Sequence, residues 1–280
     1  MSLFQSFPES PRERRRFRRI PVRALVPNII TLLALCSGLT AIRMSIEGRW
    51  EFAVVAIIVA AVLDGMDGRL ARLLKSTSRF GAELDSLADF VSFGVAPAIL
   101  LYVWGLQELR SIGWIVALVF AIAGGLRLAR FNAALDEPAR PLWQADFFTG
   151  MPIPAGAVTV LLPVYLDFLG LPRSGLTAGA TLVYTLLIAF LMISRIPTFS
   201  GKRMSQRVPR ESVLPLFVAT VLLVALLVSF TWATLAAGTL CYLVAIPFVV
   251  AYYRRLERAH AAEAADGPQP PAPDSSLSLH

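Results

Sequence analysis

Long apolar segments separated by short polar connections occupy almost the whole of this 280-residue sequence. Each segment has about 17 to 25 residues, the length that crosses the hydrocarbon core of a bilayer as an α-helix. We therefore predict an all-α, polytopic membrane bundle of about eight transmembrane helices, with spans near residues 26–45, 50–74, 80–106, 111–134, 153–169, 178–196, 213–230 and 232–253.

The composition supports this prediction. Hydrophobic residues make up 56% of the chain and charged residues only 16%, which excludes an ordinary soluble domain. Cys36 and Cys241 fall inside predicted spans without neighbouring ligand residues, so we expect them to be buried apolar thiols.

The two ends of the chain differ from the apolar middle. Residues 1–20 form a basic, polar arm, and residues 259–280 are rich in Ala, Pro and Ser. Neither segment has the apolar residues needed to form a core, so we expect both to be disordered. This leaves residues 21–258 as the transmembrane domain. The arm leads directly into a full-length span, and we expect no cleavable signal peptide.

Basic residues concentrate at alternate ends of the predicted spans. The net charge is +7, and most of this charge falls in the arm and in every second connection. By the positive-inside rule, both termini are expected in the cytoplasm, in a multi-pass protein of the cell membrane. This topology explains the charge better than nucleic-acid binding does.

Four aspartates lie inside or at the edge of the second and third predicted spans: Asp64, Asp67, Asp85 and Asp89. An aspartate near the centre of a membrane helix costs roughly 2.5 to 3.5 kcal/mol, so these side chains are expected to face inward and to bind something. Separations of three and four residues put each pair on one face of its helix. If the chain turns near residues 75–79, the two pairs meet at matching depths.

Carboxylates that are close together in a low-dielectric site repel one another unless a cation or a proton lies between them. Oxygen-only ligands without neighbouring His or Cys favour Mg²⁺ or Mn²⁺ over zinc. Four carboxylates exceed what one Mg²⁺ usually takes from a protein, so we expect two ions.

Small and polar residues accompany the aspartates. The small residues either leave a notch between the helices for a phosphate-bearing ligand or serve tight helix packing: Gly65, Gly68, Ala71, Gly81 and Ala82. Arg72, one turn beyond Gly68, has a planar guanidinium suited to phosphate. Ser78 is a candidate hydrogen-bond donor to a phosphate oxygen, although a loop serine needs no function.

The spacing D-x2-D-G-x2-A-R-x8-G-x3-D-x3-D, filled here from Asp64 to Asp89, resembles the signature of the CDP-alcohol phosphatidyltransferases. The resemblance implies a six-helix core open to the cytoplasm, usually in a homodimer. It also implies one metal on Asp64, Asp67 and Asp85 and a second on Asp64, Asp85 and Asp89. Asp89 would be the base that deprotonates the acceptor alcohol, and the CDP moiety would contact Gly68, Ala71, Arg72 and Ser78.

The signature alone does not choose among serine, inositol phosphate and glycerol 3-phosphate as the acceptor. Three further segments, PNIIT at 27–31, GLRLARFN at 125–132 and FTGMPIPA at 148–155, resemble the membrane-embedded phosphatidylserine synthases. That likeness implies CDP-diacylglycerol and L-serine as substrates, phosphatidylserine and CMP as products, and two helices added after the six-helix core.

Five residues in these segments have two interpretations each. Arg127 and Arg130 either meet the serine carboxylate or a lipid phosphate, or are positive-inside anchors. Asn132 either belongs to the acceptor pocket or caps a helix. Asn28 and Thr31 either reach the cytidine end of the lipid or form the start of a helix.

Two other classes of protein place acids in the membrane. Intramembrane prenyltransferases carry two aspartate-rich motifs in separate halves of the chain, whereas here the intramembrane acids are confined to one hairpin. A cation transporter would not require Gly68, Ala71 and Arg72 at their spacing. The sequence therefore favours phosphatidyl transfer over both.

Overall fold

The structure is a computed structural model, and it describes residues 22–74, 76, 78–134, 147–199 and 210–265. The predictions for the basic arm at 1–20 and for most of the tail concern residues outside these ranges. The last helix continues to Ala265, seven residues past the expected end of the transmembrane domain at 258.

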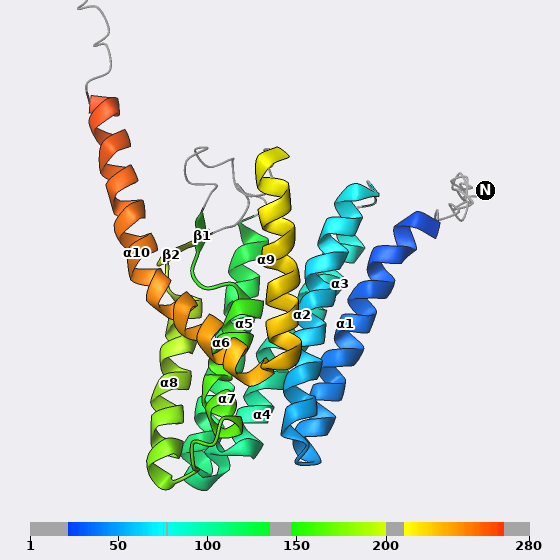
Figure 1. The fold of residues 1–280 in the computed structure, drawn as a ribbon, viewed down its shortest axis with the longest axis vertical. Coiled ribbons are helices and arrows are strands. Elements are labelled where there is room, and N and C mark those ends of the chain that lie inside the picture. The colour runs from blue at the N-terminus through cyan, green and yellow to red at the C-terminus, as the bar shows by residue number, and fades with distance from the viewer. Residues whose placement is uncertain (1–21, 75, 77, 135–146, 200–209, 266–280) are drawn as a thin grey trace, which may run out of the picture.

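The described residues form a bundle of helices (Figure 1), which confirms the predicted fold class. In chain order the helices are α1 Val22–Ile46, α2 Trp50–Leu73, α3 Arg79–Asp89, α4 Ala96–Trp104, α5 Arg110–Ala133, α6 Ile153–Val160, α7 Leu162–Phe168, α8 Gly175–Ile193, α9 Arg210–Ser229 and α10 Thr231–Ala265. A π-helical segment, Phe90–Val95, joins α3 to α4, and a 3₁₀ turn, Leu106–Leu109, precedes α5.

Six helical segments of the described chain are long and apolar enough to cross a membrane. Two of the eight expected spans fall short of that standard for different reasons. Helix α2 has 24 residues but carries the charged residues Glu51, Asp64 and Asp67. The segment Ile153–Phe168 is apolar but shorter than the others.

The third expected span is continuous but changes its winding after Asp89. The π-helical turn Phe90–Val95 is followed by Pro97 in the first turn of α4. Proline has no backbone N–H, so one carbonyl of the preceding turn lacks its usual hydrogen-bond donor. Wider π turns of this kind occur frequently at functional sites.

The fifth expected span is broken in two at Leu161. Pro163, at the start of α7, has no N–H to donate to the carbonyl of Thr159 four residues earlier. Instead the Tyr184 hydroxyl donates to that carbonyl at 2.7 Å, and the Tyr165 hydroxyl donates to the carbonyl of Val158 at 2.8 Å. Two tyrosines therefore satisfy the backbone where the helix is interrupted.

The core lies where α2, the π-helical turn, α5 and α8 meet. Ile57, Phe93, Phe120 and Ile188 are fully buried there. Helix α1 packs closely against the π-helical turn, because a Cβ atom at Gly38 would collide with Ser92. The aspartate hairpin is thus held between α1 and the core.

A two-stranded ribbon accompanies the helices and was not expected from the sequence. Strand β1, Phe147–Thr149, pairs antiparallel with β2, Pro197–Phe199, so that Phe148 lies opposite Thr198. The ribbon joins the segment before α6 to the segment after α8, beside α10 (Figure 1).

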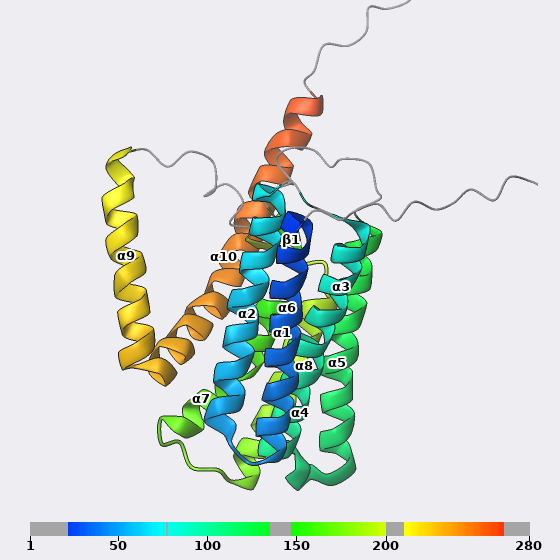
Figure 2. The ribbon, with the colours of Figure 1, turned by 90° about the vertical axis from the view of Figure 1, so that its right-hand side faces the viewer.

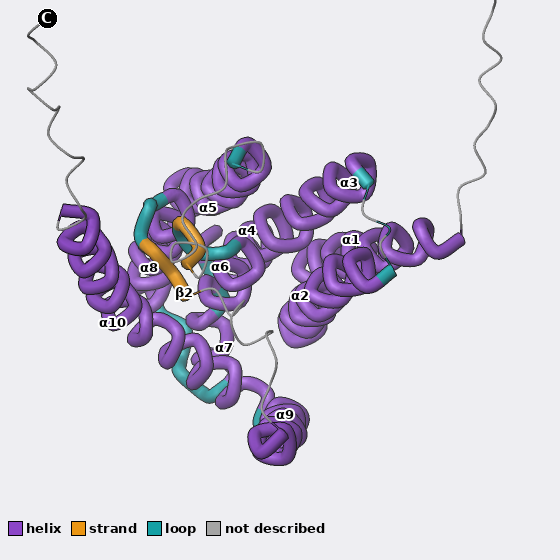
Figure 3. Tube along the Cα trace, turned by 90° about the horizontal axis from the view of Figure 1, so that it is seen from above, coloured by secondary structure: helices purple, strands orange, loops and turns teal. Residues whose placement is uncertain are grey.

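Helix α9 stands apart from the bundle, which it reaches through α10 (Figure 2). No residue in its hydrophobic window is buried, as expected of a helix whose neighbours are lipids. Viewed from above, α10 runs along one side of the bundle past α8, β2 and α7 (Figure 3). Cys36 and Cys241 are both exposed on the bundle surface, so the expectation that they are buried was wrong.

Candidate active site

The four aspartates meet between the C-terminal half of α2 and helix α3, toward the end of the bundle called here the aspartate end. Single carboxylate oxygens of Asp64, Asp67 and Asp85 all lie within 4.8 Å of one another. The carboxyl group of Asp89 is in hydrogen-bonding contact with that of Asp64. The structure therefore brings together all four side chains that the spacing singled out.

This group of carboxylates has the chemistry of a site for a hard divalent cation. Within the described residues its donors are oxygens only, which suit Mg²⁺ and Mn²⁺. Oδ1 of Asp85 is buried and has no hydrogen-bond partner in the described part of the chain. A buried carboxylate oxygen without a partner is costly, and a bound cation would remove that cost. The residues fit a metal.

Helix α1 supports the cluster through Thr31. The Thr31 hydroxyl donates to Oδ2 of Asp67 at 2.7 Å, and both residues are 4% exposed. A longer contact, 3.1 Å, joins the same hydroxyl to the Pro27 carbonyl one turn earlier in the helix. Thr31 therefore lies against a candidate metal ligand, and a hydrogen bond of this kind orients a ligating carboxylate.

A cavity of about 140 Å³ opens beside the cluster. Six of the seven residues proposed for the CDP-lipid line it, with Asp67 and Asp85 in its wall: Asn28, Thr31, Gly68, Ala71, Ser78 and Gly81. Ala82, already expected in the notch, completes the lining together with Pro27 and Ser76, which the sequence analysis missed. Only their positions next to signature residues could have pointed to them.

The two glycines of the signature have different surroundings. A Cβ at Gly68 would meet nothing within 4 Å, so this residue leaves open space beside Asp67. A Cβ at Gly81 would lie 2.9 Å from Asn28 Oδ1 and 3.2 Å from Ser78 Oγ. Gly81 thus lets α1 approach α3, whereas Gly68 leaves room for a ligand.

Ser78 and Arg72 lie at the open edge of this cavity. Oγ of Ser78 accepts a hydrogen bond from the Gly81 N–H at 3.0 Å and so caps α3. No acceptor for its own hydroxyl hydrogen is found among the described residues, so this hydrogen can donate to a ligand. Arg72, the seventh proposed residue, is exposed outside the lining, and its Nε donates to the Gly68 carbonyl at 3.0 Å.

The three acceptor-site candidates on α5 have separate positions. Arg127 is 9% exposed and interacts electrostatically with Asp89. Arg130 is exposed, and its Nη1 donates to the Ile193 carbonyl at the end of α8. Asn132 donates from Nδ2 to Ser86 Oγ at 2.9 Å and so joins α5 to α3. Of the three, Arg127 is the one directed at the aspartates.

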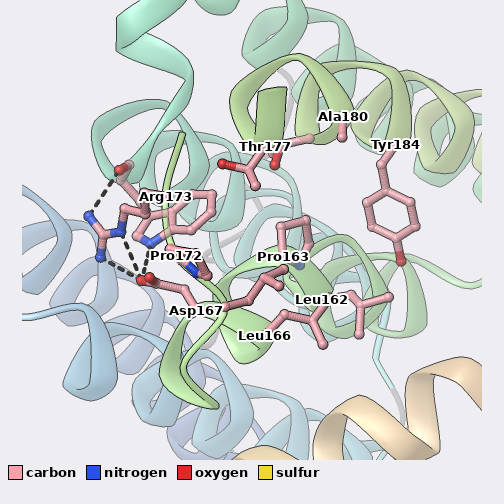
Figure 4. Close-up of a pocket in the computed structure, with 12 residues that line it drawn as sticks. Leu162, Pro163, Leu166, Asp167, Pro172, Arg173, Thr177, Ala180 and Tyr184 are labelled. Atoms are coloured by element: carbon pink, nitrogen blue, oxygen red, sulfur yellow. Dashed lines mark hydrogen bonds and ion pairs between the residues drawn. The ribbon is translucent and has the colours of Figure 1, made fainter. Parts of the chain in front are cut away.

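A larger cavity, about 230 Å³, lies at the opposite end of the bundle between α7 and α8 (Figure 4). Its two charged groups, Asp167 and Arg173, are paired with each other. Oδ2 of Asp167 accepts from Nε1 of Trp104 at 3.0 Å and from Nη2 of Arg173 at 2.6 Å, and the Arg173 guanidinium also faces the Trp104 ring at 5.2 Å. The rest of the lining is mostly apolar, so this cavity is poorly suited to a diphosphate.

Comparisons with known proteins agree with the geometry of the aspartate end. A family model described as CDP-alcohol phosphatidyltransferase matches residues 24–194, and a second, described as CDP-alcohol phosphatidyltransferase 2, matches residues 211–247. The first range contains the four aspartates and the residues that line the cavity beside them.

Several relatives share much of the chain. A CDP-diacylglycerol–serine O-phosphatidyltransferase from Mycobacterium leprae is 40% identical over 251 residues, covering 85% of this chain and 78% of the relative. An enzyme of the same name from Helicobacter pylori is 38% identical over 172 residues, covering 61% and 70%. An archaetidylserine synthase from Methanothermobacter thermautotrophicus is 37% identical over 140 residues, covering 48% and 55%.

The contact between Thr31 and Asp67 predicts an effect on cation binding. Thr31→Val removes the donor and keeps the shape of the side chain, so the affinity of the purified protein for Mn²⁺ should fall by about 10- to 100-fold. Thr31→Ser keeps the hydroxyl and should bind almost as well as the unaltered protein.

Mn²⁺ binding is measured by electron paramagnetic resonance of the free ion, which requires no turnover. Thr40→Val is the matched control, since Thr40 on the same helix is exposed and donates only to the Cys36 carbonyl. Equal affinities for Thr31→Val and Thr40→Val would show that Thr31 does not support the cation site.

Proposed function

The chain belongs to the CDP-alcohol phosphatidyltransferase family, and we propose that it transfers the phosphatidyl group of CDP-diacylglycerol to L-serine, producing phosphatidylserine and CMP. The observation that carries the proposal is the carboxylate cluster opening onto a cavity lined by the signature residues. The names of the relatives from M. leprae and H. pylori support serine as the acceptor.

The cavity beside Asp67 is the proposed site of the CDP group. Gly68 leaves open space there, and the hydroxyl hydrogen of Ser78 faces a ligand from the start of α3. Arg72 lies at the rim, where its guanidinium would meet phosphate oxygens. Asn28 lines the α1 side of the same cavity, within reach of the cytidine end of the lipid.

The aspartates would hold two Mg²⁺ or Mn²⁺ ions, one on Asp64, Asp67 and Asp85 and the other on Asp64, Asp85 and Asp89. When bound, such ions would neutralise the diphosphate and favour departure of CMP. The proposal is supported by the proximity of the carboxylates and by the unpartnered Oδ1 of Asp85.

Asp89 is the proposed base. The serine hydroxyl oxygen forms a bond to the β-phosphorus of the CDP-lipid while the bond from that phosphorus to the bridging oxygen breaks. CMP leaves with the bridging oxygen, and the hydroxyl proton passes to the Asp89 carboxylate. Arg127, beside Asp89, is the proposed partner of the serine carboxylate.

The proposal also includes the orientation of the enzyme in the membrane and its oligomeric state. The start of α1 and the end of α10 lie at the aspartate end of the bundle (Figure 1). This arrangement, together with the basic residues in the first 20 positions, supports both termini being on the cytoplasmic side of the cell membrane. A homodimer in the bilayer is the proposed assembly, as the family resemblance implies.

Removal of the proposed base is the first test of the mechanism. Asp89→Asn should lower the transfer rate by about 10²- to 10⁴-fold, since an amide cannot accept the proton. CDP-lipid should still bind, because Asp64, Asp67 and Asp85 remain. Glu83→Gln, on the exposed face of the same helix, is the control and should leave the rate unchanged. Near-normal turnover in Asp89→Asn would exclude Asp89 as the base.

The acceptor is tested by product identification. Purified protein in lipid vesicles, given CDP-diacylglycerol and Mn²⁺, should convert L-serine to phosphatidylserine and give little product with inositol phosphate or glycerol 3-phosphate. Preference for a phosphorylated alcohol would contradict the serine assignment. Cation flux through the vesicles without any lipid product would instead support a transporter.

A further inference from the structure

Arg127 is a buried cation whose charge is incompletely compensated. It is 9% exposed, on the side of α5 that faces the core. The guanidinium lies 5.4 Å from the centre of the Phe131 ring, and no hydrogen bond to an acceptor is found for it among the described residues. A buried charge is costly unless it is paired, so this site favours an anionic ligand.

A second polar group without a partner lies on α10. The Tyr242 hydroxyl is buried and makes no hydrogen bond of good geometry within the described chain. It lies near Thr198 of β2, whose Oγ1 donates to the Gly150 carbonyl at 2.8 Å. Buried tyrosine hydroxyls usually have a hydrogen-bond partner, so the missing partner of the Tyr242 hydroxyl requires an explanation.

Arg127 and Tyr242 lie close enough to interact electrostatically. Tyr242 is one of the two groups that interact electrostatically with Arg127, and the other is Asp89. They come from α5 and α10, which are more than 100 residues apart in the sequence, and α10 packs beside β2 of the ribbon (Figure 1). Gly125 lets α5 approach Phe90, the residue after Asp89, because a Cβ there would lie 3.2 Å from the Phe90 ring.

This group of residues lies apart from the proposed CDP cavity. That cavity is lined by α1, α2, α3 and the turn between α2 and α3, and neither Arg127 nor Tyr242 belongs to its lining. Asp89 is in contact with Asp64 of the cluster and also interacts with Arg127. The proposed base is therefore located between the CDP side and the Arg127 side.

We propose that Tyr242 is an acceptor-specificity residue, and that its hydroxyl and the Arg127 guanidinium together hold the carboxylate of the amino-acid acceptor next to Asp89. This inference rests on the proposed function and adds a residue from the last helix, which no signature motif contains. A carboxylate offers two oxygens, one for each of these donors. An amino alcohol without a carboxylate would leave both unsatisfied and would bind poorly.

Tyr242→Phe removes only the hydroxyl. The KM for L-serine should rise about tenfold or more, since a hydrogen bond to a charged group is lost, while the KM for CDP-diacylglycerol stays the same. The low activity with ethanolamine, which has no carboxylate, should be the same in the variant and the unaltered enzyme. Tyr102→Phe, which removes a hydroxyl from α4 outside this site, is the matched control and should leave the KM for serine unchanged.

The outcomes separate this inference from the proposed function. If the unaltered enzyme does not make phosphatidylserine, the proposed function fails before any variant is used. If it does, an unchanged KM for serine in Tyr242→Phe, or a rise only in the KM for CDP-diacylglycerol, overturns the role of Tyr242. L-serine methyl ester gives a measurement independent of any variant: the unaltered enzyme should use it far less efficiently than serine, and equal efficiency would overturn the inference.

Discussion

Four carboxylates in one membrane hairpin are the constraint on which the rest of this structure depends. Each aspartate costs roughly 2.5 to 3.5 kcal/mol near the centre of a membrane helix, and three of them have oxygens within 4.8 Å of one another. Only opposite charge and hydrogen-bond donors can compensate such a cluster. The fold supplies the Thr31 hydroxyl directly, and the oxygen-only donor set fits divalent cations.

The scaffold separates two environments around Asp89. On one side, α1, α2 and α3 enclose a polar cavity, with Gly68 leaving open space beside Asp67. On the other side, α5 and α10 present Arg127 and Tyr242 from within the packed bundle. Asp89 ends the α-helix at the start of the π-helical turn, where it is in contact with Asp64 and interacts electrostatically with Arg127. Such a separation suits a transfer in which donor and acceptor approach the base from different directions.

Local patterns predicted the helices and the aspartate cluster, because hydrophobic span length and residue spacing depend on near neighbours. The change of winding after Asp89 and the break at Leu161 were missed, although Pro97 and Pro163 were signals for them. The ribbon has only three residues in each strand, too few for a pattern. Tyr242 lies in a mostly apolar span, so only the tertiary structure shows that its buried hydroxyl lacks a partner within the described chain and interacts with Arg127. The prediction that the two cysteines are buried failed because a helix exposed to lipid has the same apolar sequence as a helix buried in the bundle.

The central claim is that the aspartate cluster binds two divalent cations beside the CDP group. Anomalous diffraction from crystals grown with Mn²⁺ and CDP tests it most directly, because the ions are located without reference to activity. The account predicts two anomalous peaks among Asp64, Asp67, Asp85 and Asp89, next to the phosphates of CDP in the cavity beside Gly68. Bound CDP with no anomalous peak among these carboxylates would contradict it.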